Sequence, residues 1–167
     1  MLRAVRVPGA LVSMRAWLIG GSRLEPTPGL ALLAGRGLGE GTLHRSWEQL
    51  ALDTEDRGMG LQTAAGTEAQ AVSINALAVD LDAALDTFVE VVREPAFPDE
   101  RLRWLARQAA AELDGLLDSP EARVQLAFLD QLYRPHPYGR PLHGLPGDLA
   151  HVEPDACADF HRRCLAW

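Results

Sequence analysis

The chain has 167 residues, of which 47% are hydrophobic and 23% are charged, proportions typical of a folded globular protein. The formal net charge of −7 disfavours a nucleic-acid partner, and no apolar run approaches the roughly 20 residues that span a bilayer. All sixteen basic residues are arginines, which excludes phosphate-binding, Schiff-base and general-base lysines. The start, MLRAVRVPGALV, lacks an apolar block followed by a cleavage site, so we expect mature sequence.

The first elements expected along the chain are a strand, a turn and a helix. Residues 10–20 are apolar with β-branched and aromatic members, a composition typical of a strand. Two prolines mark residues 22–28 as a turn, and residues 28–38 then predict a helix. Its buried side is expected to carry three leucines: Leu30, Leu33 and Leu38.

The middle of the chain predicts a helix followed by two strands. Ser46 and Gln49 have the spacing of a capping box, so a helix is expected over residues 46–57. Two extended segments should follow within residues 61–79, around a turn near residues 66–69. The second one alternates in the manner of a half-buried strand, with these inward positions: Val72, Ile74, Ala76 and Ala78.

The second half of the chain predicts helices only. The expected helices cover residues 80–94, 98–118, 119–133 and 154 to near the end, and a loop covers residues 134–147. In the first of them a stripe of apolar residues should face the core: Leu81, Leu85, Phe88 and Val92. This order predicts the α+β class, as a two-layer αβ sandwich whose mostly antiparallel sheet is covered by helices on one face. We expect residues 1–167 to form a single domain.

Three segments together resemble a known family. They are GSRLEP at 21–26, GLALLAGRGLGEGT at 29–42 and HPYGRP at 136–141, and they resemble the pitrilysin/insulinase family of inverted zinc-binding metallopeptidases. Catalytic members carry His-x-x-Glu-His, in which two His bind zinc and the Glu is the general base. The corresponding residues here are Leu32, Gly35 and Arg36, and none of them can do that work. The motif is degenerate, so no catalytic residue is assigned.

The resemblance implies one surviving ligand position. The segment around Glu112 resembles the family's segment that supplies the third zinc ligand, and a lone carboxylate does not hold zinc. Glu112 also falls in a predicted apolar stripe with Leu105, Ala109 and Leu116, where a charge usually has a partner. One hypothesis pairs it with Arg36 in the former metal site. The alternative leaves Glu112 solvated at the margin of the stripe.

Other arrangements of metal-binding or nucleophilic residues are weak. Cys157 and Cys164 are too far apart for a disulfide if their segment is helical, so we expect buried free thiols in a reducing, cytoplasmic compartment. Together with His161 they fall along one helical face, which packing explains as well as metal binding does. The remaining histidines have no spacing that places a pair on one helical face: His44, His136, His143 and His151.

Two segments have both a structural and a peptide-binding interpretation. The loop at 136–141 occurs in active and inactive halves of the family, and we favour a structural role over peptide contact. Residues 67–73 are a candidate for adding a substrate strand, as an edge strand of the family's active half does. Ordinary sheet pairing is the simpler prediction for them, and we favour it.

The resemblance implies a non-catalytic subunit or domain that completes the peptide-binding chamber of an active, zinc-bearing partner chain. It also implies that relatives continue into a further strand after Trp167, so we expect a truncated unit with an open sheet edge. A partner chain, self-association, or the rest of a longer protein of which this is a fragment would cover that edge. No cofactor is expected here, since zinc would be held only by the partner. The alternatives are a structural or assembly protein of the core-subunit type, and a metalloenzyme with a relocated site using Glu112 and scattered histidines.

Overall fold

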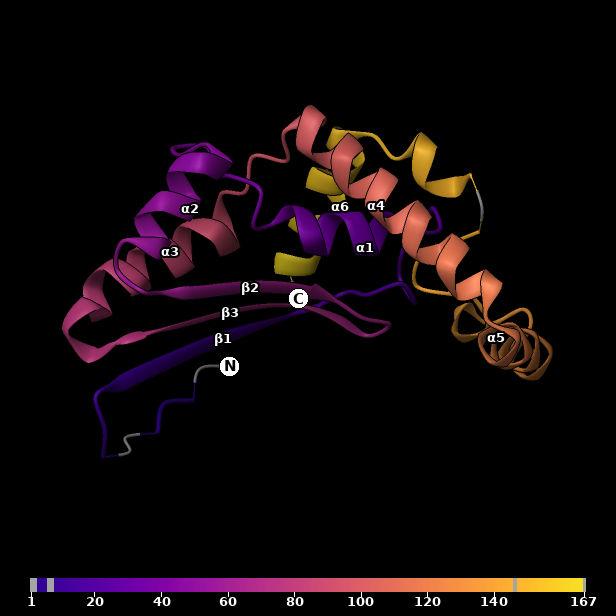
Figure 1. The fold of residues 1–167 in the computed structure, drawn as a ribbon, viewed down its shortest axis with the longest axis horizontal. Coiled ribbons are helices and arrows are strands. Elements are labelled where there is room, and N and C mark those ends of the chain that lie inside the picture. The colour runs from indigo at the N-terminus through magenta and orange to yellow at the C-terminus, as the bar shows by residue number, and fades with distance from the viewer. Residues whose placement is uncertain (1–2, 6–7, 146, 167) are drawn as a thin grey trace.

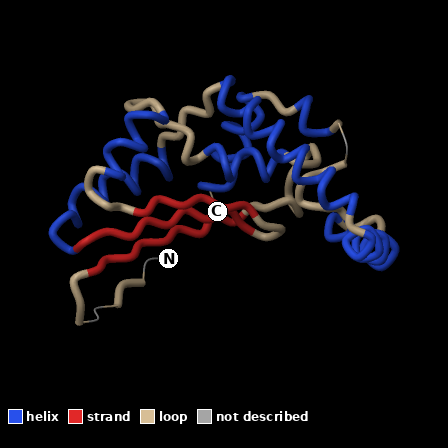
Figure 2. The backbone as a smooth tube through the Cα atoms, in the orientation of Figure 1, coloured by secondary structure: helices blue, strands red, loops and turns tan. Residues whose placement is uncertain are grey.

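A three-stranded antiparallel sheet with helices on one face makes up the computed structural model, which describes residues 3–5, 8–145 and 147–166 (Figures 1 and 2). The strands are β1 (Leu11–Ile19), β2 (Gly60–Ala65) and β3 (Ala69–Leu77). Their order is β1-β3-β2, and β3 is antiparallel to both neighbours. The predicted α+β two-layer architecture is confirmed.

Every helix expected from the sequence is present. The helices are α1 (Leu30–Gly37), α2 (Trp47–Glu55), α3 (Leu81–Arg93), α4 (Asp99–Asp118), α5 (Pro120–Tyr133) and α6 (Pro154–Leu165). Three short 3-10 turns add to them: η1 (Ala78–Asp80), η2 (Pro137–Gly139) and η3 (Asp148–His151). The predicted loop at 134–147 therefore contains a helical turn, and its residue Pro146, like Trp167, lies outside the described residues. No helix in the described ranges is long and apolar enough to cross a membrane.

The core lies between the sheet and α1, which is buried on nearly every side. Leu30, Leu33 and Leu38 are almost inaccessible, as predicted, and the alanines and glycines between them are buried as well. A helix that is apolar all round is stable only inside a protein, and α1 packs against β2, α4 and α6. On the sheet side, the core is formed by the inward residues Val72 and Ile74 of β3, which are fully buried.

The two strands expected within residues 61–79 are β2 and β3, which pair with each other and are joined by a turn at residues 66–68, as predicted. Because β3 is the central strand, residues 69–73 already bond to β1 on one side and to β2 on the other. The hypothesis that residues 67–73 pair with a substrate strand is therefore wrong for residues 69–73. The favoured prediction of ordinary sheet pairing is confirmed.

The buried face of α3 differs from the predicted stripe. Its buried residues are Ala84, Thr87 and Val91, whereas Leu81 and Leu85 are exposed. Thr87 belongs to this buried face, and its hydroxyl accepts a hydrogen bond from the guanidinium of Arg45 at 3.3 Å. The buried face of α3 therefore includes a polar contact and is not its most apolar flank.

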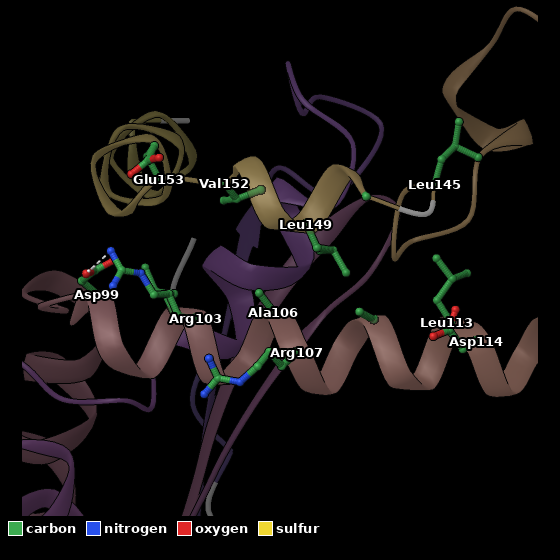
Figure 3. A pocket seen from close by; sticks show the side chains of 13 residues that line it. Asp99, Arg103, Ala106, Arg107, Leu113, Asp114, Leu145, Leu149, Val152 and Glu153 are labelled. Atoms are coloured by element: carbon green, nitrogen blue, oxygen red, sulfur yellow. Dashed lines mark ion pairs between the residues drawn. The ribbon is translucent and has the colours of Figure 1, made fainter.

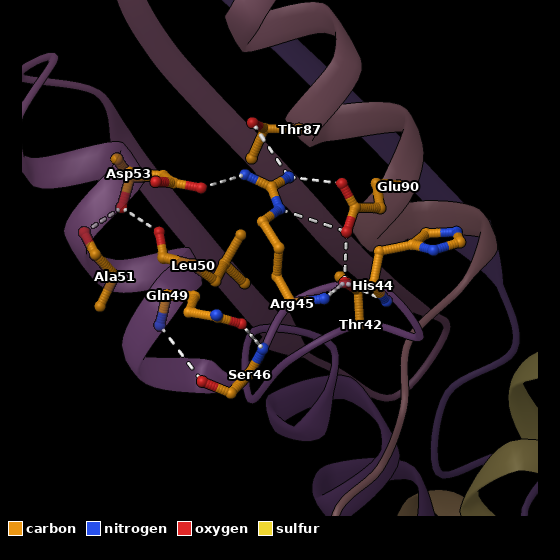
Figure 4. A network of polar contacts seen from close by, with 11 residues as sticks. Thr42, His44, Arg45, Ser46, Gln49, Leu50, Ala51, Asp53, Thr87 and Glu90 are labelled. Carbon is orange, nitrogen blue, oxygen red and sulfur yellow. Dashed lines mark hydrogen bonds and ion pairs between the residues drawn. The ribbon is translucent and has the colours of Figure 1, made fainter.

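A polar network fixes α2 and α3 to each other (Figure 4). Arg45, in the loop before α2, pairs with Glu90 of α3 at 2.5 Å and with Asp53 of α2 at 3.1 Å. The carboxylate of Glu90 raises the pKa of Arg45, so this cation stays charged. The predicted capping box is confirmed, since Ser46 and Gln49 bond reciprocally at the start of α2.

Candidate functional site

The residues at the degenerate motif positions lie on α1, in the centre of the molecule. Leu32 is only 2% exposed, so it fills the core where the resemblance places a metal ligand. Gly35 is buried as well, and Arg36 lies in the last turn of the helix, half-buried. Only Arg36 therefore presents a polar group to its surroundings.

Gly35 allows α1 to lie directly against β2. A Cβ atom at this position would be 2.8 Å from the Cβ of Ala65 and 3.1 Å from the carbonyl oxygen of Ala64. Both neighbours are rigid, because one is a single methyl group and the other is backbone. The general base of the motif would be a glutamate at this position. Its side chain has no room unless α1 and β2 move apart.

Arg36 and Glu112 form the ion pair that the sequence hypothesis required. Nη1 of Arg36 lies 3.1 Å from Oε1 of Glu112, and Nη2 lies 2.7 Å from Oε2, a bidentate geometry. The side chains are 28% and 46% exposed, so the pair lies at the surface of the molecule. Hydrogen bonding from Arg36 lowers the pKa of Glu112, and the contact with His143 lowers it further.

The predicted stripe on α4 is wrong in its second half. Leu105 and Ala109 are buried as expected, but the stripe continues through Leu113, and both Glu112 and Leu116 are exposed. Glu112 therefore lies at the margin of the buried face and is paired there, so each of the two sequence hypotheses describes part of its environment.

His143 is the third member of this cluster, and the sequence offered it only as one of the scattered histidines of a relocated metal site. Its Nε2 atom lies 3.2 Å from Oε2 of Glu112, and its side chain is only 15% exposed. The sequence showed a histidine in a Pro- and Gly-rich loop, and no local pattern connects it with a carboxylate that lies 31 positions away. Elements from three parts of the chain thus meet: α1, α4 and the loop after η2.

These residues do not fit a zinc ion. A catalytic zinc needs three protein ligands, and here two of the corresponding positions hold Leu32 and Arg36. The guanidinium of Arg36 occupies both carboxylate oxygens of Glu112 and would repel a cation. In the described part of the chain, no group of three or more His, Cys, Asp or Glu side chains is placed to hold a metal.

The trio on α6 is not a metal site either. Nε2 of His161 lies 2.9 Å from the carbonyl oxygen of Val92, which makes this nitrogen a donor, and Nδ1 is buried without a partner. Burial lowers the pKa of His161 and raises that of Cys157 to about 12, so both groups are neutral. Cys164 is buried against Gly20, and both cysteines are free, as predicted.

Glu25 is a second residue whose role the sequence did not indicate. It is 7% exposed, and its carboxylate accepts the backbone N–H of Ala31 at 2.8 Å, at the start of α1. The N-cap residue Gly29 has no side chain for this task, so Glu25 reaches forward to replace it. Burial raises the pKa of Glu25 to about 7. The sequence signal for this role is an acidic residue a few positions before a helix whose N-cap residue has no capping side chain.

The loop at 136–141 packs against the turn between β2 and β3. The hydroxyl of Tyr138 donates to Glu68 in that turn, and Arg23 pairs with the same carboxylate at 3.0 Å. The ring of Tyr138 also packs edge-on against Tyr133 and His136. These contacts support the structural role that we favoured for this loop.

A groove of about 530 Å³ lies between α4 and the segment around η3 (Figure 3). Leu102, Leu149 and Val152 line it together with two arginines, of which Arg103 pairs with Asp99 at 2.7 Å. The described lining contains no Ser, Cys or His side chain, so this groove offers no hydroxyl or thiol nucleophile and no imidazole base.

Fold and site together define a two-layer αβ unit of the inverted zinc peptidase type. In its α1 helix the positions of the His-x-x-Glu-His motif hold Leu32, Gly35 and Arg36. The sequence model of the insulinase family, peptidase family M16, matches residues 6–145. The chain therefore belongs to this family, which confirms the resemblance inferred from the three sequence segments.

Solved structures agree with this assignment. A crystal structure described as the inactive domain of a peptidase M16 from Pseudomonas fluorescens superposes with a TM-score of 0.86 at 25% identity. It is matched over 91% of this chain and 38% of its own length. A protease from Helicobacter pylori shares the fold, with a TM-score of 0.80 at 18% identity over 92% of this chain and 38% of its own. No curated protein matches.

Proposed function

We propose that this chain is a non-catalytic αβ unit of a pitrilysin-like peptidase, which completes the peptide-binding chamber of an active partner chain. The observation that carries the proposal is the bidentate pair of Arg36 and Glu112. It places a cation of the protein itself at the position where the resemblance puts the zinc. Zinc and the general base would then be supplied by the partner chain, and this unit would need no cofactor.

Two further observations support the proposal. Gly35 is packed so closely on β2 that a general base has no room in this arrangement of α1. The solved relative from Pseudomonas fluorescens is itself described as an inactive domain, and it aligns with 91% of this chain. This chain spans 38% of the length of each solved relative. That share fits a unit that acts as part of a larger assembly. We further propose that residues 1–167 act as one domain and that the assembly is cytoplasmic.

The test is reconstitution with a family chain that carries an intact His-x-x-Glu-His motif. The two chains are co-expressed, purified together, and assayed for cleavage of a quenched fluorescent peptide. We expect this chain alone to be inactive and the active chain to cleave faster in its presence. Equal cleavage with and without this chain would contradict a role in the chamber and would favour the structural or assembly alternative.

A further inference from the structure

The outer face of the sheet, which points away from the helices, carries a row of one large and two small side chains. Successive side chains of a strand point to opposite faces, and the inward ones include Val72 and Ile74. On the outer face, Trp17 of β1 lies opposite Ala71 of β3, and Ala71 lies opposite Ala64 of β2. The indole of Trp17 is 62% exposed, so it projects beside a floor of two methyl groups.

A polar row lies next to this apolar row on the same face. Arg15 lies opposite Ser73, and Ser73 lies opposite Gln62. The guanidinium of Arg15 lies over the ring of Trp17, 5.6 Å from the ring centroid, which is within the range of a cation–π contact. Ser73 is only 7% exposed although it faces outward, so it forms the floor between two longer side chains. A guanidinium that stacks on an aromatic ring can still bind a carboxylate through the N–H groups along its edge.

The two rows line a shallow hollow of about 230 Å³, which we call the outer-sheet hollow. Pockets that hold whole small molecules measure about 300–1,000 Å³, so this hollow suits one side chain of a larger ligand. Its described lining contains one charged residue, Arg15, and no carboxylate, although the chain has a net charge of −7. The hollow is therefore complementary to a ligand that is partly apolar and partly anionic. The other outward residues of the three strands are uncharged: Leu11, Ser13, Ile19, Gly60, Ala69, Asn75 and Leu77.

The hollow is formed by described residues of β1, β2, β3 and the turn between β2 and β3. Strands add to a sheet within its plane, about 4.8 Å from their neighbours. A further strand at either edge would therefore extend the two rows sideways and would not cover the hollow.

We propose that the outer-sheet hollow selects peptide segments in which one residue separates a large apolar side chain from an aspartate or glutamate. The two rows are two residues apart along the strands, which is about 6.7 Å, and an extended peptide places side chains i and i+2 on one face at the same spacing. The apolar side chain would lie on Ala71 and Ala64 beside Trp17, and the carboxylate would bind Arg15. This selectivity rests on the proposed function, in which a substrate peptide lies against this unit.

Fluorescence anisotropy of a labelled peptide titrated with the purified chain tests this selectivity and needs no partner chain. The probe is a glycine–serine peptide that contains a single Phe-Gly-Glu, and the matched control peptide contains Phe-Gly-Gln. We expect the glutamate peptide to bind about three- to tenfold more tightly, as for a partly exposed, charge-assisted pair. Equal binding of the two peptides, or no binding of either, would overturn the proposal.

Variants of the chain locate the binding site. Arg15→Gln should remove the preference for the glutamate peptide, and Arg15→Glu should reverse it in favour of a Phe-Gly-Arg peptide. The matched control is Arg123→Gln on α5, which makes the same change of charge at another exposed arginine and should leave the preference unchanged. Ala71→Leu fills the hollow and Trp17→Ala removes its wall, so each should abolish binding of both peptides. A preference that survives Arg15→Gln, or that Arg123→Gln removes equally, would contradict the site.

Cleavage by an active family chain separates the selectivity of the hollow from the proposed function. The same variants are added to the reconstituted assay with a substrate that contains Phe-Gly-Glu, and Arg15→Gln should reduce the acceleration of cleavage. If the chain accelerates cleavage and both Arg15→Gln and Ala71→Leu leave the acceleration unchanged, the proposed function stands and the selectivity is overturned. If the chain binds the peptides with the expected preference but does not accelerate cleavage, the hollow is confirmed as a peptide site and the role in the chamber fails.

Discussion

Adding a single methyl group to α1 tests whether the helix is seated as closely on β2 as the structure shows. In Gly35→Ala, the new Cβ would meet the Cβ of Ala65 at 2.8 Å and the carbonyl of Ala64 at 3.1 Å. Overpacking costs about 1–3 kcal/mol, and the rigidity of both neighbours places this case in the upper part of that range. Replacing a helical glycine by alanine returns about 1 kcal/mol, so the net loss of unfolding free energy should be about 1–2 kcal/mol.

The matched control is Gly115→Ala on α4, where a new Cβ would meet nothing within 4 Å. There only the helix-propensity gain remains, so this variant should be more stable than the parent chain by about 0.5–1 kcal/mol. Urea titrations followed by circular dichroism compare the two variants. If Gly35→Ala stabilises the chain as much as Gly115→Ala does, α1 is not packed tightly on β2 and the argument against a general base at this position fails.

Three further predictions concern buried and paired groups. Glu112→Gln should lower the free energy of unfolding by only about 0.5–1 kcal/mol, because its pair with Arg36 is partly exposed. A double-mutant cycle in urea measures the coupling energy of the two side chains, and a value near zero would contradict the pair. The pKa of Glu25 rises on folding from 4.5 to about 7, so the folded state binds the extra proton and stability should fall as pH rises through this window. Thermal melts across that range check this, and Glu25→Gln should remove the slope. Cys157 and Cys164 should resist a thiol reagent in the native protein and react in urea, whereas rapid native labelling would contradict their burial.

The sequence predicted those elements whose signals are local. The capping box of Ser46 and Gln49 defines the start of α2 through contacts within one helical turn. The alternation around Val72 and Ile74 identifies a strand with one buried face, because successive side chains of a strand point to opposite sides. The leucines of α1 were correctly placed in the core for the same kind of reason, since they recur at helical spacing.

The errors arose where tertiary contacts decide which face is buried. On α3, the buried face includes Thr87, which bonds to Arg45 from a distant part of the chain, whereas Leu81 and Leu85 are exposed. On α4, hydropathy could not distinguish the face through Glu112 from the face through Leu113, because leucines occur on both. The rotation of a helix about its axis depends on partners from distant parts of the chain, and the sequence pattern does not contain them.

The candidate site was predictable in part for a similar reason. Arg36 and Glu112 were linked through the resemblance to a family in which both positions surround a metal, and the structure places the two side chains in contact. His143 and Glu25 had no such guide. Their roles depend on a loop that folds back onto α4 and on a helix start without a capping side chain, which only the three-dimensional arrangement shows.

Zinc binding by the purified chain tests the central claim most directly. Elemental analysis after dialysis against a zinc buffer, together with titration calorimetry, should give far less than one zinc per chain, and Glu112→Gln should leave that value unchanged. One tightly bound zinc per chain that is lost in the Glu112→Gln variant would mean that Arg36 leaves this carboxylate free for a metal. The assignment of catalysis to a different polypeptide would then be contradicted.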